Sequence, residues 1–254
     1  MEDRYGVKIV RIVWHVFADV PKKLSNMANT AEGSRGILSQ KKKFYRKDCL
    51  VSIKETKSMD KKIAVIFPGM GYHVDKPLLY YSRKLAVQYG YEIVCAQYGT
   101  LPSGIKGDAK KMYAAYEMAL GNVTDQLSKI DFAAYTHVLF ISKSIGTAVA
   151  ASYDANKGIG AGHVYYTPVE ASFQAIGKRG IVFHGTGDDW AKTDVIVEEC
   201  QKRGLSLFLT EHADHSMETG DALNDLEIMK TIMKETEEYI KGFSNNREML
   251  KNTL

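Results

Sequence analysis

Short apolar runs recur along the chain from residue 61 onward, and segments with helical spacing or glycine-rich turns separate them. The runs are residues 63–67, 92–97, 137–142, 163–167, 181–184 and 205–210. Strands that alternate with helices usually pair in parallel, and helices then cover both faces of the sheet. The sequence therefore predicts an α/β fold with a mostly parallel sheet. A chain of 254 residues with 45% hydrophobic residues is long enough to bury one such core.

Three segments between and after these runs have the spacing of helices. A helix is expected between the first two runs, a short one over residues 170–176, and a long one near the C-terminus. The expected core positions of the first are Leu78, Ser82, Leu85 and Tyr89, and those of the last are Leu226, Met229, Met233 and Ile240.

Ser144 lies where a buried strand turns abruptly into a helix, between residues 138–140 and 148–151. Such a turn holds a hydroxyl above the edge of the sheet, and the next backbone N–H points into the same space. Ser144 is therefore the candidate nucleophile; an ordinary helix N-cap is the alternative. The usual pattern is G-x-S-x-G, and Ser142, another small residue, replaces its first glycine.

A serine nucleophile needs a histidine base and a carboxylate that orients this base. The run at residues 181–184 leads into a turn that carries Asp188 and Asp189. The run at residues 205–210 leads into a loop that carries His212 and His215. The three residue types therefore follow strands in the order Ser, Asp, His.

Because its serine, aspartate and histidine follow strands in this order, the chain resembles the α/β-hydrolase family over roughly residues 59–243. The acid of that family commonly lies in a G-T-x-D turn, which matches residues 185–188, and the base in a D/N-H-S segment, which matches residues 214–216. The resemblance implies that Asp188 is the acid and His215 the base. Asp189 and His212 remain the adjacent alternatives.

The run at residues 63–67 ends in the glycine-rich loop 68–72. The resemblance implies that this loop supplies one N–H of an oxyanion hole, from Met70 or alternatively Gly71, and that Ile145 supplies the other. Where the family often has His-Gly, this chain has Pro-Gly. The expected substrate-binding residues are Gly69, Gly71, Tyr72 and Trp190.

The function expected from these residues is hydrolysis of a carboxylic ester or thioester of a small molecule, without a cofactor. The alternatives are a non-catalytic binding or scaffold protein on the same fold, and an acyltransferase that uses the same triad. The connection 168–178 leaves little room for a cap over the site, so a cap-poor, open and shallow site is expected.

A dinucleotide-binding fold is the competing interpretation of Gly69 and Gly71. The third glycine of G-x-G-x-x-G is absent, because Val74 stands in its place, and residues 97–98 offer no acidic ribose ligand. No group of His, Cys and carboxylate residues has metal-ligand spacing, so no metal is expected.

One lysine and two histidines near these motifs also have side chains that could take part in the chemistry of the site. Lys143 is expected to extend into solvent, with attraction of an anionic substrate as the alternative. His73 and His184 are expected to form local hydrogen bonds.

Residues 1–58 are expected to be a basic extension, and residues 59–254 the hydrolase domain, for which Met59 fits a natural beginning. Residues 1–61 carry 14 Lys and Arg against 7 Asp and Glu, or +7, and the remainder carries 20 against 23, or −3. The extension includes a polar stretch, 25–40, and a possible edge strand, 51–53. The basic cluster 41–47 is interpreted as a solvated tail rather than a phosphate contact, so no nucleic-acid partner is expected.

The three cysteines, Cys49, Cys95 and Cys200, have no paired spacing, which favours a reducing cytoplasm without disulfides. Charged residues interrupt the apolar stretch 7–20, so neither secretion nor a membrane span is expected. The sequence does not determine the oligomeric state.

Overall fold

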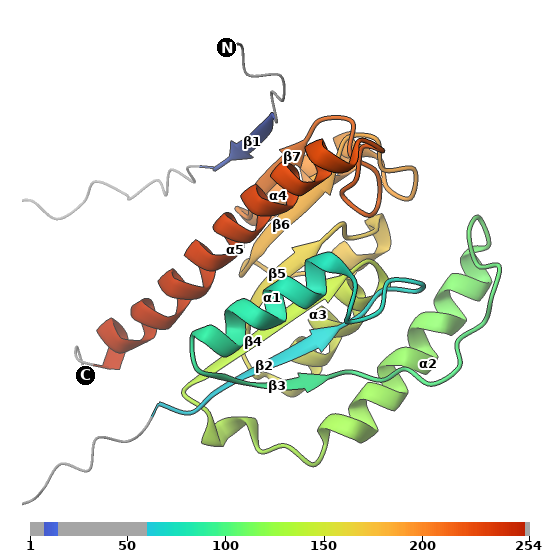
Figure 1. The fold of residues 1–254 in the computed structure, drawn as a ribbon. Helices are drawn as coiled ribbons and strands as arrows, with labels where there is room; N and C mark the ends of the chain where they lie inside the picture. Colours follow the sequence, from blue (N-terminus) through green and yellow to red (C-terminus); the bar gives the residue numbers. More distant parts are fainter. Residues whose placement is uncertain (1–7, 15–59, 252–254) are drawn as a thin grey trace, which may run out of the picture. The chain divides into compact units, whose positions relative to one another are not determined.

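The computed structural model describes residues 8–14 and 60–251, with side chains described as far as residue 243. These residues form one seven-stranded sheet in the order β1-β7-β6-β5-β4-β2-β3 (Figure 1). The strands are β1 (Ile9–Ile12), β2 (Lys62–Phe67), β3 (Tyr91–Cys95), β4 (His137–Lys143), β5 (Gly162–Tyr166), β6 (Ile181–Gly185) and β7 (Ser206–Thr210). The helices are α1 (Pro77–Gln88), α2 (Ala109–Leu127), α3 (Ile145–Lys157), α4 (Thr193–Arg203) and α5 (Ala222–Lys251), with short 3-10 helices η1 (Phe132–Ala134) and η2 (Glu170–Gln174).

Strands β2 to β7 pair in parallel, which confirms the predicted α/β fold. All six strands expected from the sequence are present, and their ends lie within two residues of the expected ones. The short helix expected over residues 170–176 is the 3-10 helix η2.

Helices cover both faces of the sheet. Helices α1 and α5 lie on one face, and α2, α3 and α4 lie on the other (Figure 1). Along β2, Ala64 and Ile66 pack toward α1, whereas Val65 and Phe67 pack toward α2 and α3. Because successive side chains of a strand point to opposite faces, a strand buried on both faces consists almost wholly of apolar residues.

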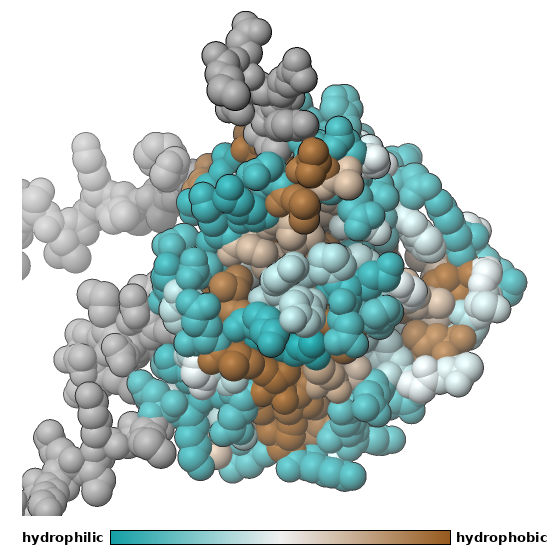
Figure 2. Space-filling model, viewed as in Figure 1, coloured by the Kyte–Doolittle hydropathy of each residue, from teal (hydrophilic) through white to brown (hydrophobic). Residues whose placement is uncertain are grey.

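The expected core face of α5 is wrong at one position. Leu226 is 64% exposed, and Figure 2 shows hydrophobic side chains on the surface near the start of α5. The buried face instead passes through Ile228, Ile232 and Ile240. At 3.6 residues per turn, Leu226 lies about 110° around the helix from the centre of this face.

Strand β1 is the part of the sheet that the sequence did not predict. It pairs antiparallel with β7, with Ile9 opposite Thr210 and Ile12 opposite Leu207, and belongs to the same compact unit as residues 60–251. The boundary expected at residue 59 leaves this strand outside the domain. The expected linker 25–40, basic cluster 41–47 and strand 51–53 lie outside the described residues.

None of the described helices combines the length and the apolar character needed to cross a membrane.

Candidate active site

Ser144 joins β4 to α3 in a backbone conformation that non-glycine residues rarely adopt, with φ 55° and ψ −125°. The turn is tight because its neighbours are small. A Cβ atom on Gly146 would lie 2.5 Å from the carbonyl oxygens of Phe67 and Pro68. Ser142 is fully buried, and its hydroxyl donates to the carbonyl of Val164 at 3.1 Å. Ser144 is therefore held at the carboxyl end of β4, close to the loop after β2.

Two hydrogen bonds join Ser144 to His215 and Asp188. The Oγ atom of Ser144 lies 2.8 Å from Nε2 of His215, and Nδ1 of the same ring lies 2.7 Å from Oδ2 of Asp188. Because an ionised carboxylate only accepts, Nδ1 carries the hydrogen, and the neutral ring leaves Nε2 free to accept from the Ser144 hydroxyl. The three side chains come from the carboxyl ends of β4, β6 and β7.

The Asp188 side chain is wholly buried, and its second oxygen accepts from the N–H of Trp190 at 2.8 Å. Burial raises the pKa of this carboxyl, but the hydrogen bond and charge of His215 outweigh burial and hold the pKa below its usual value. Asp188 is therefore ionised at neutral pH.

The imidazole of His184 lies next to the same carboxylate, but Nδ1 is 3.8 Å from Oδ2 of Asp188, which is longer than a hydrogen bond. Its Nε2 lies 3.0 Å from the hydroxyl of Thr193, which confirms the expected local hydrogen bond. Burial lowers the pKa of His184 to about 4, so this ring is neutral at pH 7. His73 also bonds locally, because it accepts from the N–H of Asp75 at 3.3 Å.

Asp189 and His212, the adjacent alternatives, lie outside the hydrogen-bonded chain at Ser144. The Asp189 side chain is 68% exposed and forms an ion pair with Lys106. His212 is exposed, and its backbone N–H donates to the Thr186 hydroxyl at 2.8 Å. The hydrogen-bonded chain that ends at Ser144 thus passes through Asp188 and His215.

The loop after β2 reaches the cavity at Ser144 through Met70. The N–H of Gly69 donates to the carbonyl of Tyr72 at 3.0 Å, the N–H of Tyr72 donates back at 3.3 Å, and Gly71 has φ 69°. Met70, inside this turn, lines the same cavity as Ser144 and Ile145. Among the described residues, the N–H groups of Met70 and Ile145 have no hydrogen-bond partner. Two backbone N–H groups without a partner thus belong to residues that line the same cavity as Ser144.

Lys143 does not extend into solvent as expected, because the side chain is fully buried. Its Nζ atom has no hydrogen-bond partner among the described residues and lies 5.1 Å from the ring centroid of Tyr72. Burial lowers the pKa of Lys143 to about 7, and the carboxylates of Asp188 and Asp214 oppose this shift. The side chain turns inward because β4 is covered on both faces, which strand periodicity alone does not reveal.

Strained backbone gathers around the same three residues. The non-glycine residues with positive φ in the described part of the chain are Ser144, Thr167, His212 and Met217. The Thr167 hydroxyl donates to the carbonyl of His215 at 3.1 Å, and His212 and Met217 lie in the loop that carries His215. Such strain persists where surrounding packing enforces it, and it concentrates at functional sites.

A cavity of about 290 Å³ opens beside Ser144, between α2, α3 and η2. The site is therefore less shallow than expected, because α2 forms a wall that the short connection after β5 does not supply. Ile105, just before α2, and Met112, Tyr113 and Tyr116 on α2 line this wall, and no sequence motif marks them. The cluster of apolar and aromatic residues after β3 was the available signal.

The four expected substrate-binding residues separate into two places. Trp190 lines the cavity, and its ring stacks on that of His215 with centroids 5.5 Å apart. Gly69, Gly71 and Tyr72 form the turn that holds Met70. The Tyr72 hydroxyl accepts from the N–H of Leu78 at 3.1 Å, so this side chain fixes the turn from behind.

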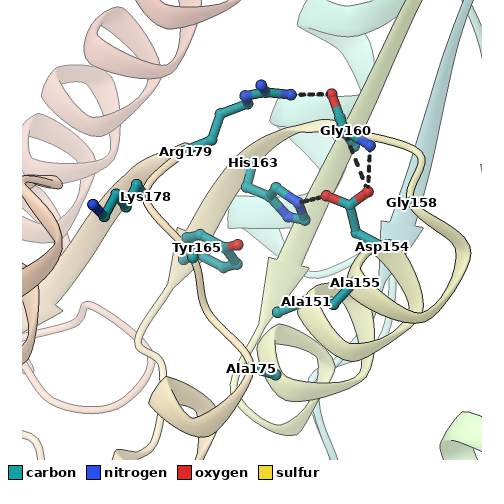
Figure 3. A pocket seen from close by; sticks show the side chains of 12 residues that line it. Ala151, Asp154, Ala155, Gly158, Gly160, His163, Tyr165, Ala175, Lys178 and Arg179 are labelled. Atoms are coloured by element: carbon teal, nitrogen blue, oxygen red, sulfur yellow. Dashed lines mark hydrogen bonds and ion pairs between the residues drawn. The ribbon is translucent and has the colours of Figure 1, made fainter.

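A second Asp–His pair, in which the histidine is buried, lies in another pocket, at the amino end of β5 (Figure 3). The carboxylate of Asp154 lies 2.8 Å from Nε2 of His163 and accepts from the N–H groups of Gly160 and Ala161. No serine, threonine or cysteine is among the described residues that line this pocket. The pair therefore ties the C-terminus of α3 to β5. No group of three or more His, Cys, Asp or Glu residues in the described ranges is arranged to hold a metal ion.

Comparison with solved structures identifies the architecture. Over 76% of this chain and 92% of the other, the structure matches Est1E from Butyrivibrio proteoclasticus with ferulic acid bound, at a TM-score of 0.55 and 11% identity. The chain has the α/β-hydrolase fold. The esterase Pf2001 from Pyrococcus furiosus matches over 73% of this chain and 84% of the other, at a TM-score of 0.50 and 14% identity.

No protein-family model and no curated protein sequence matches the chain. The α/β-hydrolase fold thus rests on the arrangement of the sheet and helices. In such sheets the loops at the carboxyl ends of the strands form the ligand site, and Ser144, Asp188, His215 and Met70 lie in four of these loops.

Proposed function

We propose that this chain is a serine hydrolase that cleaves a carboxylic ester or thioester of a small molecule. The observation that carries the proposal is the pair of hydrogen bonds, at 2.8 and 2.7 Å, that joins Ser144 to His215 and His215 to Asp188. The esterases among the solved structures with the same fold give further support, since one of them, Est1E, has an aryl carboxylic acid bound.

In the proposed reaction, the Ser144 oxygen attacks the acyl carbon while His215 takes the hydroxyl proton at Nε2. Asp188 holds the ring in the required tautomer and stabilises its positive form. The N–H groups of Met70 and Ile145 donate to the oxyanion that develops on the carbonyl oxygen. Each such donor typically contributes about 100- to 1000-fold to the rate.

The tetrahedral intermediate then collapses, the bond to the alcohol or thiol breaks, and His215 gives its proton to the leaving group. Water enters, His215 takes one of its protons, and the hydroxide attacks the acyl group on Ser144. The acid leaves, and the proton returns to the Ser144 oxygen. This sequence requires no cofactor.

The test is labelling by a fluorophosphonate probe together with hydrolysis of nitrophenyl esters. Ser144→Ala and His215→Ala are each expected to lower turnover by several orders of magnitude. The double variant is expected to be hardly worse than either, because triad residues act as a unit. Ser142→Ala is the matched control and is expected to keep labelling and most turnover, since Ser142 bonds only a backbone carbonyl.

A wild-type chain that the probe does not label would make this protein a binding or scaffold protein instead. Labelling without hydrolysis, with transfer of the acyl group to an added alcohol or amine, would make it an acyltransferase. The cytoplasmic location stays a prediction from the cysteines, of which Cys95 and Cys200 are free thiols.

A further inference from the structure

The cavity beside Ser144 has a wall of uncharged side chains. Its volume is about 290 Å³. The large residues of the wall are Ile105, Met112, Tyr113, Tyr116 and Trp190. No Asp, Glu, Lys or Arg is among the described residues that line the cavity. A charged substrate group would lose its hydration there without gaining an ion-pair partner, so the cavity favours a neutral group.

The floor of the cavity follows one face of α3. Ser144, Ala148 and Ser152 all line the cavity and are spaced by four residues, which places them on one side of the helix. The helix rises ~12 Å from Ser144 to Ser152. The small side chain of Ala148 leaves the middle of this path open. At about 30 Å³ for each water-sized group, the volume holds on the order of ten non-hydrogen atoms.

The end of the path farthest from Ser144 is polar. The Tyr116 hydroxyl donates to Oγ of Ser152 at 2.8 Å, and Ser152 is only 8% exposed. Tyr116 is the one side-chain partner of Ser152 among the described residues, so the Ser152 hydroxyl keeps its own hydrogen to donate. An acceptor on a bound substrate satisfies this donor, whereas a purely apolar group leaves it without a partner.

Contacts from the segment before α2 keep the wall in place. The ammonium group of Lys106 lies 5.1 Å from the ring centroid of Trp190 and pairs with Asp189. Trp190 in turn stacks on His215. Three aromatic side chains, Tyr113, Tyr116 and Trp190, are thus available to pack against a flat ring.

We propose that the substrate is an ester with a neutral aryl group, and that Ser152 and Tyr116 bind a hydroxyl or carbonyl oxygen at the far end of this group. The proposal rests on the serine-hydrolase function above and adds the substrate class. The aryl group that enters the cavity belongs to one part of the ester, either the acyl part or the alcohol part.

The test compares two ester series with the full chain. One series consists of methyl acetate, methyl phenylpropanoate and methyl para-hydroxyphenylpropanoate. The other consists of the acetates of ethanol, phenylpropanol and para-hydroxyphenylpropanol. In one series kcat/KM is expected to rise with the phenyl ring and to rise again, roughly three- to tenfold, with the hydroxyl group.

Variants of Ser152 and Tyr116 test whether these two residues cause the increase in kcat/KM that the hydroxyl group brings. In Ser152→Ala and in Tyr116→Phe, the ratio of kcat/KM between the hydroxyphenyl and phenyl esters is expected to fall toward one. Tyr81→Phe is the matched control, because Tyr81 is an exposed tyrosine on α1, and its ratio is expected to equal that of the wild type. Ala148→Leu, which narrows the path, is expected to lower the ratio of kcat/KM between the phenyl ester and the ester without a ring.

Two results would overturn the proposal while leaving the hydrolase intact. One is that the ester without a ring, methyl acetate or ethyl acetate, is cleaved best in both series, and the other is a hydroxyl effect that survives Ser152→Ala. Failure of every ester together with absence of fluorophosphonate labelling would instead refute the proposed function. Because each result is a ratio within one variant, partial loss of folded protein does not mimic it.

Discussion

His215 and Lys143 are the residues whose charges change near the pH at which the site is expected to work. Burial lowers the pKa of His215 below its ordinary 6.5, Asp188 opposes this shift, and the charge of Lys143 adds to it. A base must be neutral to accept a proton, so the acid limb of kcat/KM is expected below about pH 6.5.

Removing the charge of Lys143 gives the first prediction. At acid pH Lys143 is positive, because its pKa is about 7, and it disfavours protonation of His215. Lys143→Met is therefore expected to raise the pKa of His215 and to move the acid limb to higher pH. The measurement is the pH profile of kcat/KM. An unmoved limb would show that the charge of Lys143 does not affect the pKa of His215. Burial and the charges of Asp188 and Asp189 would then determine this pKa.

The same variant tests stability. The pKa of Lys143 falls from 10.5 in the unfolded chain to about 7 in the fold, so the unfolded state binds more protons between these values. The free-energy cost of burying the positive charge of Lys143 is complete below pH 7 and disappears as pH rises toward 10.5. Lys143→Met is expected to raise the free energy of unfolding by on the order of a few kcal/mol at pH 6 and by less at pH 9.

Urea unfolding of both chains at the two pH values is the measurement. Lys84→Met, which replaces an exposed lysine on α1, is the control and is expected to change stability little at either pH. A loss of stability at pH 6 in Lys143→Met would mean that the Tyr72 ring and the nearby carboxylates more than compensate for burial of the charge.

Asp188 and Asp189 are predicted to differ in their effect on turnover. Asp188→Asn is expected to lower kcat by several orders of magnitude, because an amide at this position no longer fixes the His215 tautomer. Asp189→Asn is expected to have a much smaller effect, because its carboxylate is exposed and pairs with Lys106. Steady-state kinetics on one nitrophenyl ester decides, and the reverse ranking would transfer the role to Asp189.

At the scale of elements, strand β1 pairs with β7 and falls in the same compact unit as residues 60–251. Ile9 and Ile12 are half-buried and pack against opposite faces of the sheet, whereas Val10 is 43% exposed. An edge strand of four residues adds little area to the core, but it covers the backbone groups of β7.

A chain that begins at Met59 is therefore expected to fold and to keep its activity, but with a lower urea midpoint and a greater tendency to aggregate. The full chain with Ile9→Ser and Ile12→Ser together is expected to show the same lower midpoint. Val10→Ser is its control, with little expected effect. Light scattering and urea unfolding are the measurements. An unfolded truncated chain would show that residues 1–58 complete the core.

At the scale of the whole molecule, the candidate site depends on one sheet. Ser144, Asp188 and His215 follow β4, β6 and β7, so no single strand or helix contains the site. A site assembled in this way is expected to disappear together with the fold, in one cooperative transition.

Trp190 reports this transition, since its ring stacks on His215. In a Trp14→Phe background Trp190 is the remaining tryptophan of the sequence. Its fluorescence, the ester hydrolysis rate and the far-UV circular dichroism are expected to change at the same urea concentration. Activity that is lost at distinctly lower urea would show that the loops of the site open before the sheet does.

The sequence by itself determined the parallel sheet, the strand-to-helix turn at Ser144 and the order Ser, Asp, His. These features depend on local periodicity and on residues that a turn requires, such as Gly146, and both can be read from neighbours along the chain. Tertiary structure decided the rest. Strand β1, the inward turn of Lys143, the exposure of Leu226 and the wall that α2 adds to the cavity depend on contacts between segments far apart in sequence. A one-dimensional pattern shows which side chains are apolar, but only packing decides which surface covers them and which polar group remains buried without a partner.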